Sequence, residues 1–183
     1  MDNVEIILKN VARKNIEKVF FNSLVFDIKN IISSHFFDKE KNVDMEYQNV
    51  KSLNKYFDTS GAGNLYLKKV IIGTELENVL ILIGCDEKYG DITINFEEEQ
   101  FENFSIQEIK GKLKNLIMFL LNIYRNNEIE EITIGYEPAY DEDRKIIEIR
   151  QSKVMIFNEG TFKSPIALIL YSISKNIMTQ VWS

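Results

Sequence analysis

Five groups of residues have side chains that could do chemistry, and each lacks part of the pattern that its chemistry needs. Ser60-Gly61-Ala62-Gly63 looks like a phosphate-binding loop, but the pattern after it predicts a strand instead of a helix. A phosphate loop needs the N–H groups of a following helix, and its Gly-Lys-Ser/Thr is also absent here. We therefore interpret these residues as part of a connecting loop.

Two acidic clusters, Asp86–Asp91 and Asp141–Asp143, could supply oxygen ligands to calcium. A calcium loop of the EF-hand type needs oxygen ligands at its first, third and fifth positions and glycine at its sixth. The first cluster has Lys88 at the third position and Gly90 at the fifth, and the second cluster has no glycine. We interpret both clusters as turns and predict no cofactor.

Catalytic pairs are equally incomplete. His35 and Cys85 are the single histidine and the single cysteine, and no third group that would orient such a pair is indicated. Acid–base catalysis by Glu97-Glu98-Glu99 or Glu137 would need a carboxyl whose pKa burial has raised, whereas adjacent acids are usually exposed. We predict that the protein is not an enzyme, and an enzyme with an unrecognised site remains an alternative.

In the N-terminal part of the chain, the spacing of apolar residues predicts the secondary structure. Apolar residues recur at spacings of three and four over 3–37, which predicts a long N-terminal helix. Residues 45–58 fit a short helix or a strand, and this choice stays open. Residues 58–64 have the composition of a loop. With 183 residues, the chain has the length of a single domain over 1–183.

The rest of the chain is predicted to form both strands and helices. Ser105 and Glu108 form a capping box, which predicts the start of a helix over 105–126. Ser164-Pro165 predicts the start of a C-terminal helix. Strands are predicted over 65–73, 79–85, 91–96, 129–136 and 145–157. The predicted fold class is α+β, with a mostly antiparallel sheet, a three-strand meander plus a hairpin, packed with a long N-terminal helix, a central helix and a C-terminal helix.

Charge is unevenly distributed along the chain, whose net charge is −6. Residues 75–108 hold ten acids and one base, and residues 128–148 hold eight acids and two bases. These acidic segments are unfavourable for phosphate, so we expect no nucleic-acid ligand. A single cysteine excludes an internal disulfide, and no apolar stretch approaches the roughly 20 residues of a membrane-spanning helix. We expect a cytoplasmic protein without a membrane partner.

Aromatic residues lie in or beside the acidic segments, and aromatics among charges are typical of protein interfaces. An acidic surface of this kind would complement a basic protein partner. We therefore predict a non-catalytic binding protein. The predicted partner-binding residues are Asp86, Glu87, Tyr89, Asp91, Glu97, Glu98, Glu99, Tyr140, Asp141, Glu142 and Asp143.

The acidic hairpin Gly84–Asp91, the run Glu130–Pro138 and the order of elements resemble the immunity proteins of bacterial polymorphic toxin systems. Those are small, acidic, cytoplasmic α+β proteins that neutralise a toxin by binding it. The resemblance implies the same role here, with a toxin domain as the basic partner. It is carried by architecture, so it assigns no individual binding residue. A structural or oligomerising module of another bacterial system is the alternative non-catalytic function.

Overall fold

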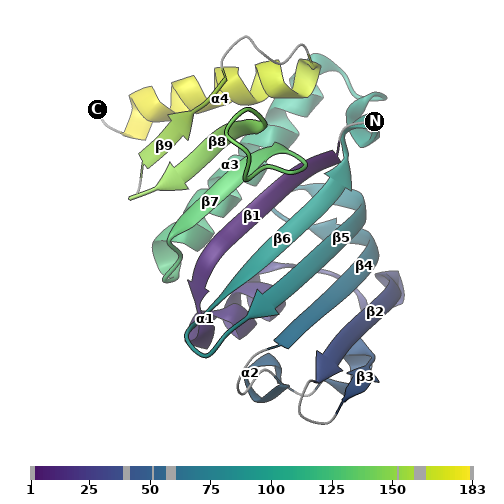
Figure 1. The fold of residues 1–183 in the computed structure, drawn as a ribbon. Coiled ribbons are helices and arrows are strands. Elements are labelled where there is room, and N and C mark those ends of the chain that lie inside the picture. The colour runs from purple at the N-terminus through teal and green to yellow at the C-terminus, as the bar shows by residue number, and fades with distance from the viewer. Residues whose placement is uncertain are drawn as a thin grey trace.

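A nine-stranded antiparallel sheet organises the computed structural model, which describes residues 3–38, 42–50, 52–56, 61–151, 153–158 and 164–181. The strand order across the sheet is β3-β2-β4-β5-β6-β1-β7-β8-β9 (Figure 1). The strands are β1 (Asn3–Ala12), β2 (Ile31–Asp38), β3 (Val43–Met45), β4 (Gly61–Ile71), β5 (Glu75–Cys85), β6 (Tyr89–Glu97), β7 (Glu131–Tyr136), β8 (Lys145–Arg150) and β9 (Lys153–Ile156).

The predicted arrangement is wrong in two ways: the sheet has nine strands in place of a three-strand meander plus a hairpin, and no long N-terminal helix forms within the described residues. The chain begins with β1, which pairs with β6 on one side and β7 on the other. Val4, Ile6 and Leu8 alternate along β1 and are at most 2% exposed, so the relevant period is two. The apolar spacing predicted a helix here because Ile7, which lies on the opposite face of the strand, adds an apolar residue to the alternating pattern.

Short helical segments fill the connections before β4. They are α1 (Arg13–Glu17), the π-helix η1 (Lys18–Ser23), the 3₁₀ turns η2 (Ile28–Asn30) and η3 (Tyr47–Asn49), and α2 (Leu53–Tyr56). The ambiguous segment 45–58 thus contains the end of β3 and two short helical pieces, and Phe57 and Asp58 lie outside the described residues. Gly63 belongs to β4, where an added Cβ would lie 2.4 Å from the Phe36 ring. The close approach of the Phe36 ring therefore explains why a residue without a side chain occupies this position.

Two long helices pack against the sheet, one contacting β7 and, at Gly73, the β4–β5 turn, and the other contacting β8 and β9. They are α3 (Ile106–Asn126) and α4 (Pro165–Val181), and they also contact each other. The capping box is confirmed, because the Glu108 N–H donates to Ser105 Oγ at 3.3 Å and the Ser105 N–H donates to Glu108 Oε2 at 2.8 Å. No helix among the described residues is long and apolar enough to cross a membrane.

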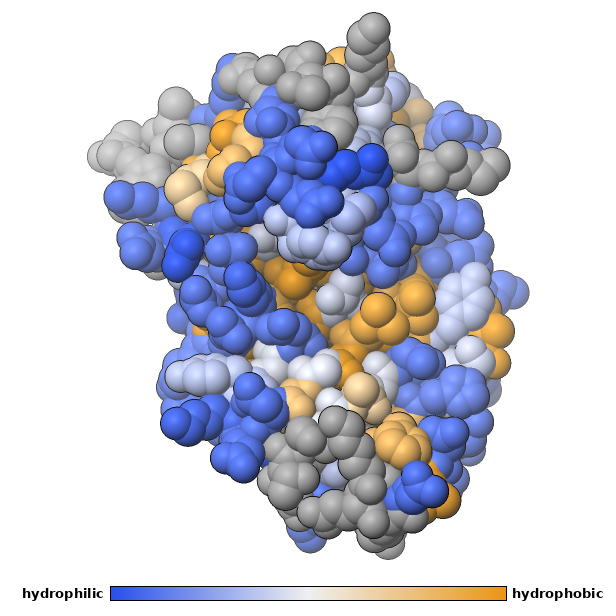
Figure 2. Space-filling view, in the orientation of Figure 1, coloured by the Kyte–Doolittle hydropathy of each residue, from blue (hydrophilic) through white to orange (hydrophobic). Residues whose placement is uncertain are grey.

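The near face of β4, β5, β6 and β1 in Figure 1 carries no helix among the described residues. Figure 2 shows hydrophobic side chains in a hollow at the centre of this face. Strand register places Ile7, Leu80 and Leu82 on it, and Leu82 is 39% exposed. The buried core lies on the other face, where Ile6, Ile81 and the helices pack.

Candidate partner-binding surface

The predicted partner-binding residues lie in two groups, at the two opposite ends of the central strands of the sheet. Strand β6 joins these ends, since the hairpin Asp86–Asp91 is at its start and Glu97–Glu99 is at its finish. Nine residues of strand separate them by roughly 25–30 Å. The β7–β8 loop, with Tyr140–Asp143, lies at the Glu97 end, because the Glu137 N–H donates to the Asn3 carbonyl and Asn3 pairs with Glu97. The acids therefore do not form one continuous surface.

At the hairpin end, two carboxylates stabilise the local backbone. The side chain of Asp86 accepts hydrogen bonds from the N–H groups of Lys88 and Tyr89, each at 2.8 Å. These bonds hold the pKa of the Asp86 carboxyl below its usual value. Asp91 Oδ1 accepts the N–H of Asn10 at 2.7 Å, where Asn10 has a φ of +50° at the β1 bulge. Both acids thus fix the shape of this end of the sheet.

The neighbouring acids at the hairpin end are mostly neutralised by cations. Glu128 forms an ion pair with Lys14, and Glu130 accepts from the Arg150 guanidinium at 3.2 Å. Glu87 is exposed and its carboxylate has no hydrogen-bond or ion-pair partner in the described part of the chain. Tyr89 is 47% exposed beside shallow depressions of about 220 and 420 Å³. Few free charges therefore remain at this end.

At the other end, the 3₁₀ turn η4 (Glu98–Phe101) follows β6 directly. Gln100 fastens this turn, because its Oε1 accepts the Glu77 N–H at 3.0 Å and its Nε2 donates to the Glu97 carbonyl at 2.9 Å. The Glu98 carboxylate accepts the Tyr136 hydroxyl at 3.1 Å and also accepts the Ser164 hydroxyl. The turn is therefore anchored to strands β5 and β7 and to the start of α4.

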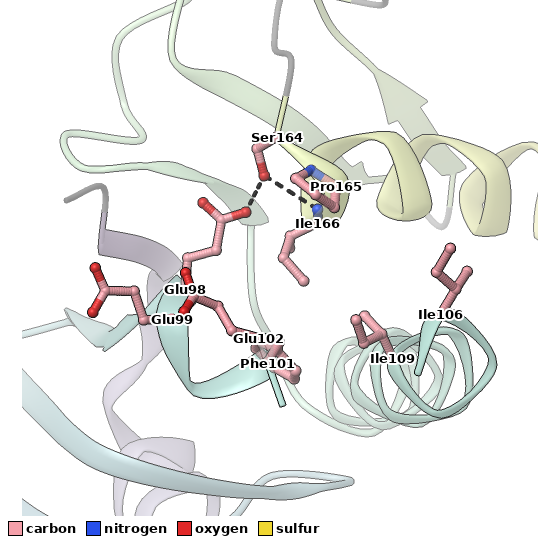
Figure 3. Close-up of a pocket in the computed structure, with 9 residues that line it drawn as sticks. All are labelled: Glu98, Glu99, Phe101, Glu102, Ile106, Ile109, Ser164, Pro165 and Ile166. Carbon is pink, nitrogen blue, oxygen red and sulfur yellow. Dashed lines mark hydrogen bonds between the residues drawn. The ribbon is translucent and has the colours of Figure 1, made fainter. Parts of the chain in front are cut away.

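A cleft of about 560 Å³ opens between η4 and the first turns of α3 and α4 (Figure 3). Phe101, Ile109 and Ile166 in its lining are at most 6% exposed. Ile106 stands at the lip and is 66% exposed. The remaining lining residues are Glu98, Glu99, Glu102, Ser164 and Pro165. The cleft thus combines apolar side chains with three carboxylates.

Two of these three carboxylates have no partner in the part of the chain that the structure describes. Glu99 and Glu102 are exposed, and neither side chain has a hydrogen-bond or ion-pair partner within the described ranges. Figure 3 shows both on the η4 side of the cleft, opposite Ile106 and Ile109 on α3. Sequence reasoning included Glu98 and Glu99 but missed Glu102, which the same acidic run could have indicated. It also missed Ile106 and Ser164, because nothing in the sequence brings α3 and α4 to η4.

The β7–β8 loop at the same end is held by buried ionisable groups. Glu5 is 7% exposed, and its Oε2 accepts the Ala139 N–H at 2.6 Å. Burial raises the pKa of the Glu5 carboxyl, the bond from Ala139 lowers it, and the nearby Glu137 charge raises it, with a net increase. Tyr140 is 70% exposed at the tip of the loop. The loop therefore presents an aromatic side chain from a fixed base.

Lys145 neutralises part of this loop. Its ammonium lies 2.7 Å from Glu148 and 3.1 Å from Glu142. Burial disfavours the charged ammonium, but the hydrogen bonds to Glu148 and Glu142 outweigh it and raise the pKa of Lys145. Asp141 and Asp143 are exposed. Among the described residues, no group of three or more His, Cys, Asp or Glu side chains could hold a metal ion.

Comparisons with known proteins identify the family. The model of the PABL017 Cdi1I immunity protein family matches residues 2–152. The chain belongs to this family. The hypothesis of an immunity protein, made from the acidic hairpin and the order of elements, is therefore confirmed. The matched segment of this immunity protein includes both acidic ends of the sheet, whereas Ser164–Ile166, the α4 side of the cleft, lies beyond it.

A solved structure has a similar fold. It is the 1.75 Å crystal structure of the toxic C-terminal tip of CdiA from Pseudomonas aeruginosa in complex with an immune protein. The TM-score is 0.56 and the identity is 17%, with 80% of this chain and 94% of that chain covered. No curated protein matched the chain.

Proposed function

We propose that this immunity protein acts in the cytoplasm and neutralises a toxin domain by binding it directly, without catalysis. The chain's family supports this role, and the similar solved structure is a complex between a toxic domain and its immune protein. Direct binding requires an exposed surface of suitable charge and shape and no reacting group. The partner that suits this chain is basic, because the net charge is −6 and both concentrated segments are acidic.

The unpaired carboxylates beside the cleft carry this proposal. Glu99 and Glu102 are exposed and have no ion-pair partner among the described residues, so a basic partner gains attraction there without breaking an ion pair that this part of the chain contains. Glu97 and Glu98 extend the same negative surface, and the loop residues Tyr140, Asp141, Glu142 and Asp143 lie at the same end of the sheet. We place the main contact at this end.

The hairpin end has a smaller part in the proposal. Asp86 and Asp91 are occupied in hydrogen bonds to the backbone, so their reversal would disturb the turn as well as the charge. Glu87 and Tyr89 are exposed there and could touch the partner without such a conflict. We propose that this end adds long-range attraction, which affects the rate of association more than the lifetime of the complex.

A binding titration against the cognate toxin domain tests the proposal. The immunity protein should bind that domain tightly and abolish its toxicity when both are produced in one cell. The double reversal Glu99→Lys with Glu102→Lys should slow association at least about 10-fold and weaken its dependence on salt. Glu87→Lys at the hairpin is the matched control for Glu99→Lys alone, since each reverses one charge, and the hairpin variant should have the smaller effect.

Two outcomes would contradict the proposal. If the wild-type protein protects cells but shows no binding to the toxin domain, neutralisation is indirect. If Glu87→Lys slows association more than the Glu99 and Glu102 reversal does, the main contact lies at the hairpin end. Melting curves of each variant would separate a lost contact from a lost fold.

A further inference from the structure

The cleft has two chemically different walls. One wall, formed by η4 and the residue that follows it, carries Glu99 and Glu102, whose carboxylates are exposed and unpaired among the described residues. The opposite wall, on α3, carries Ile106 and Ile109 (Figure 3). Phe101 forms a buried apolar base between them. An occupant that satisfies both walls needs positive charge on one edge and apolar surface on the other.

Both walls are held in place before any partner arrives. The capping box of Ser105 and Glu108 fixes the first turn of α3, and therefore the position of Ile106 at the lip. On the other side, Glu98 accepts the hydroxyls of Tyr136 and Ser164, which ties η4 to β7 and α4. A preorganised site loses little conformational entropy on binding, which favours affinity.

Ile106 is the least protected large apolar residue beside this site, with 66% of its surface exposed. Helix α3 does not need it for packing, because its buried stripe starts at Ile109. Covering an apolar side chain of this size removes apolar surface from water and so stabilises the complex. An exposed isoleucine at the lip of an apolar cleft is therefore the kind of group that a partner covers.

The size of the cleft limits what can enter. Its volume of about 560 Å³ lies within the roughly 300–1,000 Å³ of pockets that bury a small ligand. A whole helix cannot fit in such a space, but one or two large side chains projecting from a partner can. The carboxylates exclude a phosphate-bearing occupant by repulsion.

We infer that the cleft receives a large apolar side chain of the toxin domain, flanked by Lys or Arg. The apolar group contacts Ile106 and Phe101, and the flanking cation contacts Glu99 or Glu102. The inference rests on the proposed direct binding of a toxin domain, and it specifies the chemistry of the contact. The apolar contact holds the complex together, and the carboxylates guide its formation.

Measured rates of binding between the immunity protein and the cognate toxin domain test this inference. Ile106→Ala should speed dissociation about 10-fold with little change in association, whereas Ile106→Leu should stay close to wild type. Glu99→Gln with Glu102→Gln should mainly slow association and reduce its salt dependence. Met118→Ala is the matched control, because Met118 lies on the same helix, is 44% exposed and is outside the cleft.

The outcomes separate this inference from the proposed function. If the wild-type protein does not bind the toxin domain at all, the proposed function fails and the inference fails with it. If the wild-type protein binds, but Ile106→Ala and Met118→Ala dissociate equally slowly, the proposed function stands and the inference is wrong. Tighter binding of a small apolar amine than of the toxin domain, lost in Ile106→Ala, would also overturn it in favour of a ligand pocket.

Discussion

The two acidic ends of the sheet differ in what their carboxylates do. At the hairpin end, Asp86 and Asp91 accept backbone N–H groups, and Glu128 and Glu130 pair with cations. At the cleft end, Glu99 and Glu102 are exposed and have no partner among the described residues, although Glu98 beside them is anchored. Equal acidity in the sequence therefore corresponds to structural acids at one end and available acids at the other.

This difference shows how a charge cluster should be interpreted. Carboxylates that accept backbone N–H groups contribute to the stability of a turn, and their removal changes the fold before it changes binding. Carboxylates without partners mildly repel one another, and a basic partner relieves that repulsion. The comparison predicts that mutations at the hairpin end affect stability, whereas mutations at the cleft end affect binding.

The largest expected effect on stability is at the hairpin, at Gly90. An added Cβ there would lie 2.5 Å from Ile16 Cδ1 and 2.6 Å from the Gly84 carbonyl oxygen. Gly90→Ala should therefore lower the free energy of unfolding by about 1–3 kcal/mol. Gly84→Ala is the matched control, because an added Cβ at Gly84 meets nothing within 4 Å. Denaturant titrations measure both, and equal stability of the two variants would show that the hairpin tolerates crowding.

A smaller effect is expected at Asp86, and it should depend on pH. The folded pKa is below the usual 3.8, so the carboxylate stabilises the protein above that pH and this stabilisation disappears as pH falls through the folded pKa. Asp86→Ala should lower the melting temperature at pH 7 and match the wild type in strong acid. Asp86→Asn keeps an acceptor for the Lys88 and Tyr89 N–H groups, so it should lose less at pH 7.

Glu5, near the cleft end, should show the opposite pH dependence. Its folded pKa lies above the usual 4.5, so stability should fall as pH rises above 4.5 and level off once the folded carboxyl is ionised. Glu5→Gln removes this ionisation while keeping an oxygen for the Ala139 N–H. Melting temperatures from pH 4 to 8 should therefore decline less in Glu5→Gln than in the wild type. If the melting temperatures of both proteins declined identically, ionisable groups other than Glu5 would cause the decline.

The smallest effect on stability is expected at the cleft. Glu99→Gln with Glu102→Gln should change the free energy of unfolding by no more than about 0.5 kcal/mol, because neither carboxylate has a partner in the described structure. The same double variant slows association with the toxin domain if the proposed contact is right. A loss of stability as large as that of Gly90→Ala would remove the contrast between the two ends.

Local signals in the sequence were sufficient for part of the fold. Ser105 and Glu108 marked the start of α3, and the pattern after them marked its buried face, because a capping box and a helical stripe are properties of one segment. Ser164-Pro165 marked the start of α4 for the same reason. The strands predicted over 79–85 and 91–96 lie within β5 and β6, whereas the one predicted over 65–73 starts four residues after the start of β4 and ends two residues beyond its end.

The N-terminal strand and the cleft could not be predicted in this way. Strand β1 is defined by its pairing with β6 and β7, which lie about 85 and 130 residues further along the chain. Its local pattern fitted a helix as well, and the tertiary pairing decided the outcome. The cleft likewise needs η4, α3 and α4 to meet, so only the acids of η4 were visible as candidates.

The central position of β1 has a consequence for how the protein forms. Ile6 of β1 pairs with Ile94 and with Ile134, so β1 meets its second neighbour only after about 130 further residues have been made. Contacts so distant in sequence slow folding, since a long loop must close before they form. A cell that makes this protein therefore meets a delay between translation of β1 and the presence of a folded immunity protein.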